Sequence, residues 1–189
     1  MIFLKRIYIR WKVRTGRAVN IWSRAPYPAG ALSNLYNHSF VFEDVACGSM
    51  ESFLQSLKVK SAHDQQVKCG LDGLKAKLAG SSKWKETQRV YWKGKTLGRH
   101  SVEFQLLIRR AYKALFTQNE DFRQALLATK GKQLYHVQGK TNPYDTILTA
   151  QEFCRILEEL RDAAPWRHQE VLDQYKVCTR RHCPFREIC

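Results

Sequence analysis

Apolar residues recur at helical spacing in the stretch GSMESFLQSLKVK, residues 48–60. Spacings of three and four residues place side chains on one side of a helix, and the apolar positions here are Met50, Phe53, Leu54 and Leu57. Glu51 stands beside this stripe in the first turn, where the helix dipole favours a carboxylate. The pattern predicts a helix that buries the stripe and holds Glu51 at its flank.

Three further helices are predicted from periodicity together with capping residues. Residues 101–116 follow the N-cap candidate Ser101, and a second helix starts at the N-cap candidate Asn119. A third opens with a capping box that runs from Thr149 to Glu152.

Two more helical segments are less regular. Residues 62–80 predict a helix that Gly70 and Gly73 weaken, and residues 165–178 predict a short final helix before a cysteine-rich tail. Period-two alternation is partial in residues 1–17, which we interpret as a basic strand or arm. Short strands are expected at residues 18–23, 39–45 and 133–137. Residues 81–100 are expected to be mainly a surface loop.

These elements predict a mostly helical α+β fold with a few short strands. We expect a single domain at residues 30–164, preceded by the basic arm 1–29 and followed by the helix and cysteine-rich tail 165–189.

Charge narrows the class of partner. The chain has 32 Lys and Arg against 17 Asp and Glu, a net charge of +15, which indicates a polyanionic partner. Residues 1–30 hold seven of these cations without an acid, and residues 61–100 hold nine against three acids. Both blocks also carry aromatic residues that could stack on bases: Trp11, Trp22, Trp84, Tyr91 and Trp92. The alternative is that both blocks are only solvent-exposed basic faces without a partner.

The sequence contains no apolar run of about 18 residues, so we expect no membrane partner. Its first residues are too charged for a signal peptide. They could still form a short basic amphipathic segment. We therefore expect a cytoplasmic protein with reduced thiols. The sequence does not predict an oligomeric state.

The cysteine-rich tail offers weak metal ligands. Zinc sites usually pair cysteines at the spacing C-x2-C, and the gaps here are longer, so ordinary thiols are favoured; the residues are Cys178, His182, Cys183 and Cys189. The sequence also lacks a phosphate-binding Walker loop, GxGxxG, GxSxG and HExxH, which argues against the enzyme classes built on these motifs. We expect no cofactor.

Several segments, in order, resemble the NADAR family, the relatives of the bacterial YbiA N-glycosidase. The stretch LSNLYNHSFVFEDVACGSMESFLQSLK resembles the family's opening loop, strand and Glu-containing helix, and LGRHSVEFQLLIRRAYKALFTQNEDFRQALLAT and QLYHVQGK resemble its later blocks. The resemblance covers residues 30–162. The departures lie near His100, where the family has a tryptophan, and at residues 139–148, which replace a Trp-Gly-rich segment.

The resemblance implies hydrolysis of N-glycosidic bonds between ribose and a base or amine. The family glutamate matches Glu51, and Asp145 or His100 would act across the pocket. A carboxylate in that place stabilises the positive charge that develops on the sugar or activates the attacking water. The motif positions Asn34, Gln55 and Lys58 are candidates for substrate contact.

The net charge favours a nucleic-acid substrate, with DNA preferred, because phosphates dominate affinity for nucleic acid. Trp84, Tyr91 or Trp92 would stack on an extruded base, and the cations expected on the phosphates are Lys93, Lys95 and Arg99. Two alternatives remain: an N-glycosidase of a free nucleotide or riboflavin-pathway intermediate, and a non-catalytic module that binds nucleic acid or ADP-ribose. Phage defence and nucleotide housekeeping both fit the enzyme readings.

Overall fold

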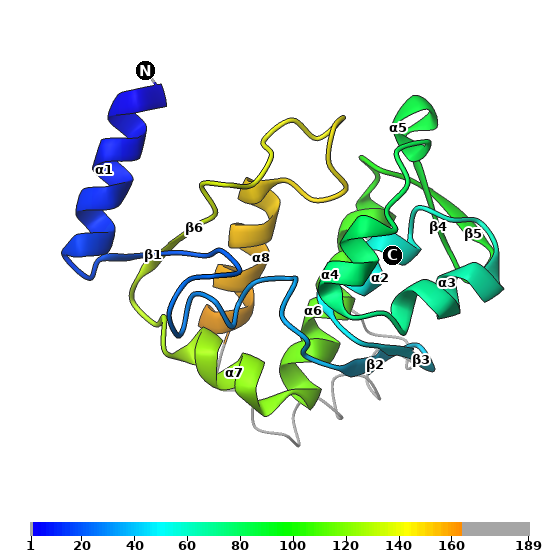
Figure 1. Cartoon of the computed structure of the whole chain (residues 1–189), viewed down its shortest axis with the longest axis horizontal. Helices are drawn as coiled ribbons and strands as arrows, with labels where there is room; N and C mark the ends of the chain where they lie inside the picture. Colours follow the sequence, from blue (N-terminus) through cyan, green and yellow to red (C-terminus); the bar gives the residue numbers. More distant parts are fainter. Residues whose placement is uncertain (1, 164–189) are drawn as a thin grey trace, which may run out of the picture.

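The computed structural model describes residues 2–163, in which two buried helices, Met50–Ser56 and Val102–Gln118, contact each other and most of the other helices pack against one of them (Figure 1). The helices are α1 (Ile2–Arg14), α2 (Met50–Ser56), α3 (Ala62–Cys69), α4 (Gly73–Leu78), α5 (Trp84–Thr87), α6 (Val102–Gln118), α7 (Glu120–Leu127) and α8 (Ala150–Asp162). The strands are β1 (Ala18–Asn20), β2 (Phe40–Phe42), β3 (Val45–Cys47), β4 (Arg89–Trp92), β5 (Lys95–Gly98) and β6 (Gln133–Tyr135). The α+β class predicted from the sequence is confirmed.

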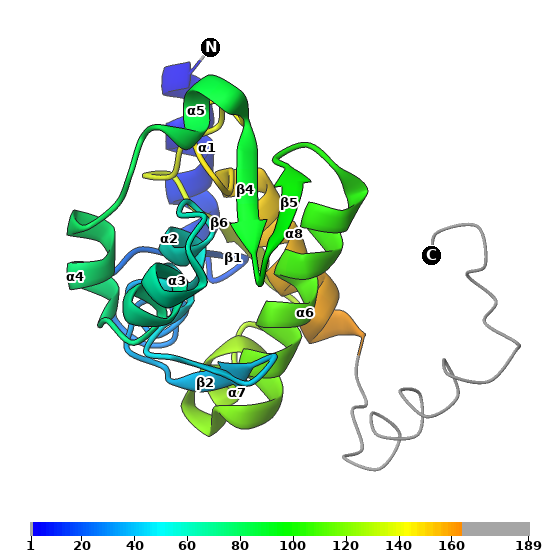
Figure 2. The same cartoon turned by 90° about the vertical axis from the view of Figure 1, so that its right-hand side faces the viewer.

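The strands form three two-stranded sheets among the described residues. β2 and β3 make one antiparallel hairpin, and β4 and β5 make another, which lies beside α6 (Figure 2). The third pair is parallel and joins distant parts of the chain, with Val19 of β1 opposite Leu134 of β6. This pair ties the N-terminal segment to the strand that leads into the loop before α8.

Helix α2 lies in the core as its apolar spacing predicts. Met50, Phe53, Leu54 and Leu57 are each at most 2% exposed, so the stripe is buried along its whole length. The helix begins with a reciprocal cap in which Ser49 and Ser52 each bond the other's backbone amide at 3.0 Å. Glu51 is half-buried at the flank of this rigid helix.

The capping residues predicted for the later helices are confirmed. The side chains of Ser101, Asn119 and Thr149 each accept a bond from an amide in the first turn of α6, α7 and α8. Thr149 and Glu152 form the full capping box. Side-chain caps satisfy amides that the first turn of a helix leaves without partners, which explains why these starts could be read from sequence.

The strand predicted for residues 1–17 is wrong, because residues 2–14 are helical. The segment has neither glycine nor proline before Gly16, and the alternation there was incomplete. Ile9 packs against the body at 6% exposure, so a single helical side makes contact rather than every second residue.

Residues 81–100 are more ordered than the predicted surface loop, since they contain α5 and the β4–β5 hairpin. Val90 and Trp92 are buried and anchor this hairpin in the core. The helix expected at 62–80 is divided into α3 and α4, and Asp72 caps the second.

Cys47, Cys69 and Cys154 are free and buried. Within residues 2–163 no cluster of three metal-ligating side chains occurs, and no helix there is long and apolar enough to cross a membrane. The helix predicted at 165–178 and the candidate ligands Cys178, His182, Cys183 and Cys189 lie outside the described residues.

Candidate functional site

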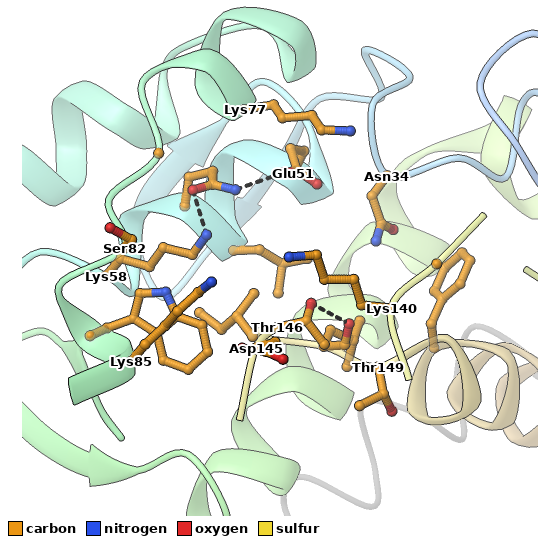
Figure 3. A pocket seen from close by; sticks show the side chains of 18 of the residues that line it. Asn34, Glu51, Lys58, Lys77, Ser82, Lys85, Lys140, Asp145, Thr146 and Thr149 are labelled. Carbon is orange, nitrogen blue, oxygen red and sulfur yellow. Dashed lines mark hydrogen bonds between the residues drawn. The ribbon is translucent and has the colours of Figure 1, made fainter. Parts of the chain in front are cut away.

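A cavity of about 490 Å³ opens between α2, the α4–α5 loop and the loop that joins β6 to α8 (Figure 3). Six of the predicted site residues line it: Asn34, Glu51, Gln55, Lys58, Trp84 and, from the β6–α8 loop, Asp145. Two of the three sides come from loops, whereas α2 supplies a wall fixed by core packing. The cavity is the place where the predicted glutamate and its neighbours meet.

A chain of hydrogen bonds runs along the cavity face of α2. Gln55 donates from Nε2 to Oε1 of Glu51 at 2.7 Å, and Lys58 donates from Nζ to Oε1 of Gln55, also at 2.7 Å. The three side chains follow at spacings of four and three residues, so they lie on one side of the helix. Gln55 is 6% exposed and holds the carboxylate and the amine at fixed positions.

Asn34 is hydrogen-bonded to the first turn of the same helix. Its backbone carbonyl accepts the Glu51 amide at 2.9 Å, and its side-chain Oδ1 accepts the hydroxyl of Tyr112 at 2.7 Å. Burial raises the pKa of the Tyr112 phenol well above its usual value, so the hydroxyl remains a donor. With Oδ1 occupied, the Nδ2 group is the part of the amide free to donate to a bound molecule.

Four lysines make the cavity strongly positive: Lys58, Lys77, Lys85 and Lys140. Burial lowers the pKa of Lys58 to about 8, the charges of Lys85 and Lys140 act in the same direction, and Glu51 partly opposes them. Like charges gathered in one site favour an anionic ligand, which would relieve their repulsion.

His136 forms part of the wall next to α8. Its Nδ1 lies 2.7 Å from the carbonyl oxygen of Ile21, which can only accept, so Nδ1 carries a proton. The neutral ring then presents Nε2 as an acceptor. Gly139 lies so close that a Cβ there would be 2.3 Å from His136 Cδ2, and this contact requires a residue without a side chain.

A second carboxylate enters the cavity from the β6–α8 loop. Asp145 is exposed, and its Oδ2 accepts a 2.7 Å bond from Nδ2 of Asn142. The loop is fixed at its end by Thr146, which donates to the Leu148 carbonyl at 2.9 Å. Glu51 and Asp145 therefore come from a helix and a loop that face the same space (Figure 3).

Trp84 supplies an aromatic surface to the cavity. It is 4% exposed, and the ammonium of Lys58 lies 6.0 Å from its ring centroid. Lys85, the next residue, also lines the cavity. An aromatic plane beside two cations is suited to a ligand that has both a flat ring and phosphate groups.

The other predicted site residues do not line the cavity. His100 is exposed, bonds Gln88 at 3.1 Å and lies against Tyr144, so it does not face Glu51. Tyr91 is half-buried in β4, and Lys93 lies in the hairpin turn, where it donates to the Glu43 carbonyl at 2.7 Å. Lys95 is exposed on β5.

Two of these predictions conflict with the structure. Arg99 is 1% exposed and makes a two-pronged ion pair with Glu152, at 2.6 and 3.1 Å, so it cannot reach a backbone phosphate. Trp92 is 3% exposed, packs edge-on against Phe53 and donates to Glu43 at 2.7 Å, so its ring is not free to stack on a base. Both are structural residues of this fold.

Sequence reasoning missed four residues of the site: Lys77, Lys85, His136 and Lys140. They lie in the predicted helix 62–80, the predicted loop 81–100, the predicted strand 133–137 and the loop after it, and no local spacing shows that these segments meet. The fragment QLYHVQGK did carry a signal, because a histidine follows the strand directly and a lysine lies four residues further along.

The arrangement unites a rigid carboxylate, a second carboxylate, several cations and an aromatic wall. Such a site can hold a phosphorylated, ring-containing molecule and place a carboxylate beside its sugar.

Comparison with known proteins identifies relatives by sequence and by structure. The family model described as Bacteriophage protein GP30.3 matches residues 26–162. An uncharacterized 17.1 kDa protein of the Gp30–rIII intergenic region of Enterobacteria phage T4 is 40% identical over 149 residues, which cover 77% of this chain and 97% of the T4 protein. The NMR structure of the Escherichia coli protein YbiA aligns with 89% of this chain and 92% of its own, with a TM-score of 0.55 and 16% identity. The YbiA-like fold expected from the NADAR resemblance is thereby confirmed.

Proposed function

The chain belongs to the Bacteriophage protein GP30.3 family and has the fold of YbiA, and on this premise we propose that it is an N-glycosidase. It hydrolyses the bond between ribose and a base or amine. The preferred substrate is a modified or ADP-ribosylated base in nucleic acid, and DNA is favoured.

The carboxylate of Glu51 carries this proposal. It lies on the cavity wall, its Oε1 is fixed by Gln55, and within residues 2–163 no salt bridge neutralises it. An N-glycosidic bond breaks with positive charge building on the sugar, and a fixed carboxylate beside that sugar lowers the energy of the transition state.

Asp145 has the complementary role in this proposal. Its exposed carboxylate lies on the opposite loop, where it orients or deprotonates the attacking water. Paired carboxylates divide the same two tasks in enzymes that hydrolyse O-glycosidic bonds. His100 is not needed, since its ring lies outside the cavity.

Substrate binding rests on the cations and on Trp84. Lys58, Lys77 and Lys140 supply positive charge for phosphates, and the buried Trp84 supplies part of the cavity wall against which a base would lie. A base taken from a duplex must leave the stack, and an aromatic wall compensates part of that cost. The excess of positive charge along the chain adds affinity for a polynucleotide that a small metabolite would not need.

The size of the cavity favours the second candidate, a free nucleotide or riboflavin-pathway intermediate. About 490 Å³ is in the usual range for sites that enclose one small molecule. The two candidates use the same carboxylates and differ in whether the substrate continues beyond the cavity.

The Glu51→Gln variant tests the activity. The purified protein is incubated with ADP-ribosylated DNA, base-modified DNA and free nucleotides, and released base is measured by chromatography. Glu51→Gln should bind with unchanged affinity and lose at least about a hundredfold in turnover, as loss of a transition-state interaction predicts. The matched control is Glu103→Gln, which removes an exposed first-turn acid from α6, away from the cavity.

The pattern of release separates the candidates. Release from DNA that falls steeply with salt supports a nucleic-acid substrate, and release from free nucleotide alone supports the second candidate. Binding without release from any of these substrates would instead identify a non-catalytic module for nucleic acid or ADP-ribose. Full activity of Glu51→Gln would remove Glu51 from the mechanism.

A further inference from the structure

Helix α1 is not accounted for by the proposed catalytic site. It precedes residue 26, where the family match begins, and it stands off from the rest of the molecule (Figure 1). Its thirteen residues contain five cations and no acid: Lys5, Arg6, Arg10, Lys12 and Arg14. A helix with this composition is repelled by a second copy of itself and attracted to a polyanion.

The outward side of α1 is unusually apolar for an exposed helix. Ile9 faces the body, whereas Ile7, Tyr8 and Trp11 are each about half exposed, at 48%, 50% and 48%. Exposed aromatic side chains in a group have a large area that a partner could cover. The question is which polyanion would use them.

The aromatic rings of α1 are arranged with cations across their faces. Tyr8 and Trp11 have centroids 6.2 Å apart and planes inclined by 26°. Lys12 lies 4.8 Å from the Tyr8 centroid, and Arg17 lies 5.3 Å from that of Trp11. Stacked rings next to cations are the elements with which proteins hold unpaired bases and the adjoining phosphates.

A lipid surface fits this helix less well. Helices that lie on membranes separate an apolar side from a charged side. On α1 apolar residues face both inward and outward, and the cations divide them: Arg6, Arg10 and Arg14 form one row at four-residue spacing, and Lys12 lies on the other flank. Burying Trp11 in lipid would also draw Arg17 away from water.

We infer that α1 is a docking arm for single-stranded nucleic acid, in which Tyr8 and Trp11 stack on bases and the row of Arg6, Arg10 and Arg14 contacts phosphates. The arm connects to the cavity through the backbone. After Arg17, β1 pairs with β6, and β6 leads directly to His136 and Lys140 of the cavity wall. The inference does not depend on the proposed activity, because binding is measured without turnover.

The test measures binding of a fluorescently labelled oligothymidylate by anisotropy between 50 and 300 mM salt. The triple variant Arg6→Gln/Arg10→Gln/Arg14→Gln should bind more weakly and reduce the slope of log affinity against log salt by about 2. Trp11→Ala should weaken binding about tenfold with little change in that slope. The matched control, Lys60→Gln/Arg89→Gln/Arg155→Gln, removes three exposed cations that lie outside α1 and outside the cavity, and it should retain the arm's share of the affinity.

Circular dichroism and melting temperature verify that each variant is folded. Glu51→Gln should bind the oligonucleotide like the unaltered protein, so failure of the arm and failure of the proposed chemistry are distinguishable. An equal loss in the arm and control variants, tighter binding to a duplex of the same length, or binding to phosphatidylglycerol vesicles without binding to oligonucleotide would each overturn the inference.

Discussion

The hydroxyl of Tyr112, in the buried centre of α6, donates a 2.7 Å hydrogen bond to Oδ1 of Asn34 at the edge of the cavity. Asn34 in turn accepts the backbone amide of Glu51 through its carbonyl. A core residue therefore sets the orientation of an amide at the site, and the same loop holds the start of α2. Tyr112 is a positioning residue, because it acts through Asn34.

Tyr112→Phe should weaken both stability and substrate binding. Loss of the hydroxyl leaves Asn34 Oδ1 without its donor, which we expect to lower the free energy of unfolding by about 1–2 kcal/mol. The freed amide can also rotate, so KM should rise while kcat changes less. Urea unfolding and steady-state kinetics measure the two effects, and Tyr27→Phe, at an exposed tyrosine, is the control.

The buried pair of Arg99 and Glu152 predicts sensitivity to acid. Burial alone would raise the pKa of Glu152, but the hydrogen bonds and charge of Arg99, together with the Thr149 amide, outweigh it and lower the pKa to about 2 from an ordinary 4.5. A lowered carboxyl pKa stabilises the fold above about pH 4.5, and this contribution is lost as the pH falls towards 2.

Glu152→Gln should therefore cost about 3 kcal/mol at pH 7, because Arg99 remains buried without its counter-charge. The difference in the free energy of unfolding between Glu152→Gln and the unaltered protein should shrink when urea unfolding is repeated from pH 5 down to pH 2.5. Glu86→Gln, at an exposed acid of α5, should show no such convergence. A constant difference across this range would mean that the ion pair does not govern the acid response.

Gly139→Ala should disturb the cavity wall. The new Cβ would be 2.3 Å from Cδ2 of His136 and 2.9 Å from Cβ of Ala150, so the ring must move from the Ile21 carbonyl that holds it. Overpacking of this kind costs about 1–3 kcal/mol. Gly70→Ala is the matched control, since its Cβ would have only ordinary contacts at 3.7 Å. Thermal melts and ligand affinities are measured for both variants. Equal melting temperatures and affinities for the two variants would contradict the prediction.

Binding of a phosphate-bearing ligand should weaken above neutral pH. Burial lowers the pKa of Lys58 to about 8, so its positive charge is present below pH 8 and is lost as the pH rises through that value. We expect the affinity for ADP-ribose to fall about tenfold between pH 7 and pH 9, the contribution of one charge-assisted hydrogen bond. Lys58→Arg keeps its charge and should flatten this dependence in titration calorimetry; a similar fall in both proteins would assign the effect to another group.

The sequence was sufficient to predict the elements whose ends are marked by nearby capping residues. Ser101, Asn119 and Thr149 satisfy amides within three residues of themselves, so each helix start is visible without knowledge of the fold. Glu51 could also be placed at the flank of its helix, since the position follows from spacing alone.

The remaining features depend on contacts between distant segments. Arg99 looked like a surface cation among polar neighbours, but Glu152, 53 residues later, draws it into the core. Lys77 of α4 and Lys140 of the β6–α8 loop reach one cavity although they lie more than sixty residues apart in sequence. Helix α1 was misjudged because residues 6–14 bury little apolar surface apart from Ile9, so their hydrophobic pattern is only a weak indicator of secondary structure.

The parallel pairing of β1 with β6 sets a lower limit on the length of chain that can form the site. The Ile21 carbonyl accepts a hydrogen bond from His136 Nδ1, and Asn20 Oδ1 accepts one from the Val137 amide at 3.0 Å, yet both residues precede the region that the family model matches. A shortened protein that begins at residue 26 would keep every carboxylate and lysine of the cavity but leave one edge of β6 bare. The β6–α8 loop would then lose its register, and the truncated protein should be prone to strand-mediated aggregation.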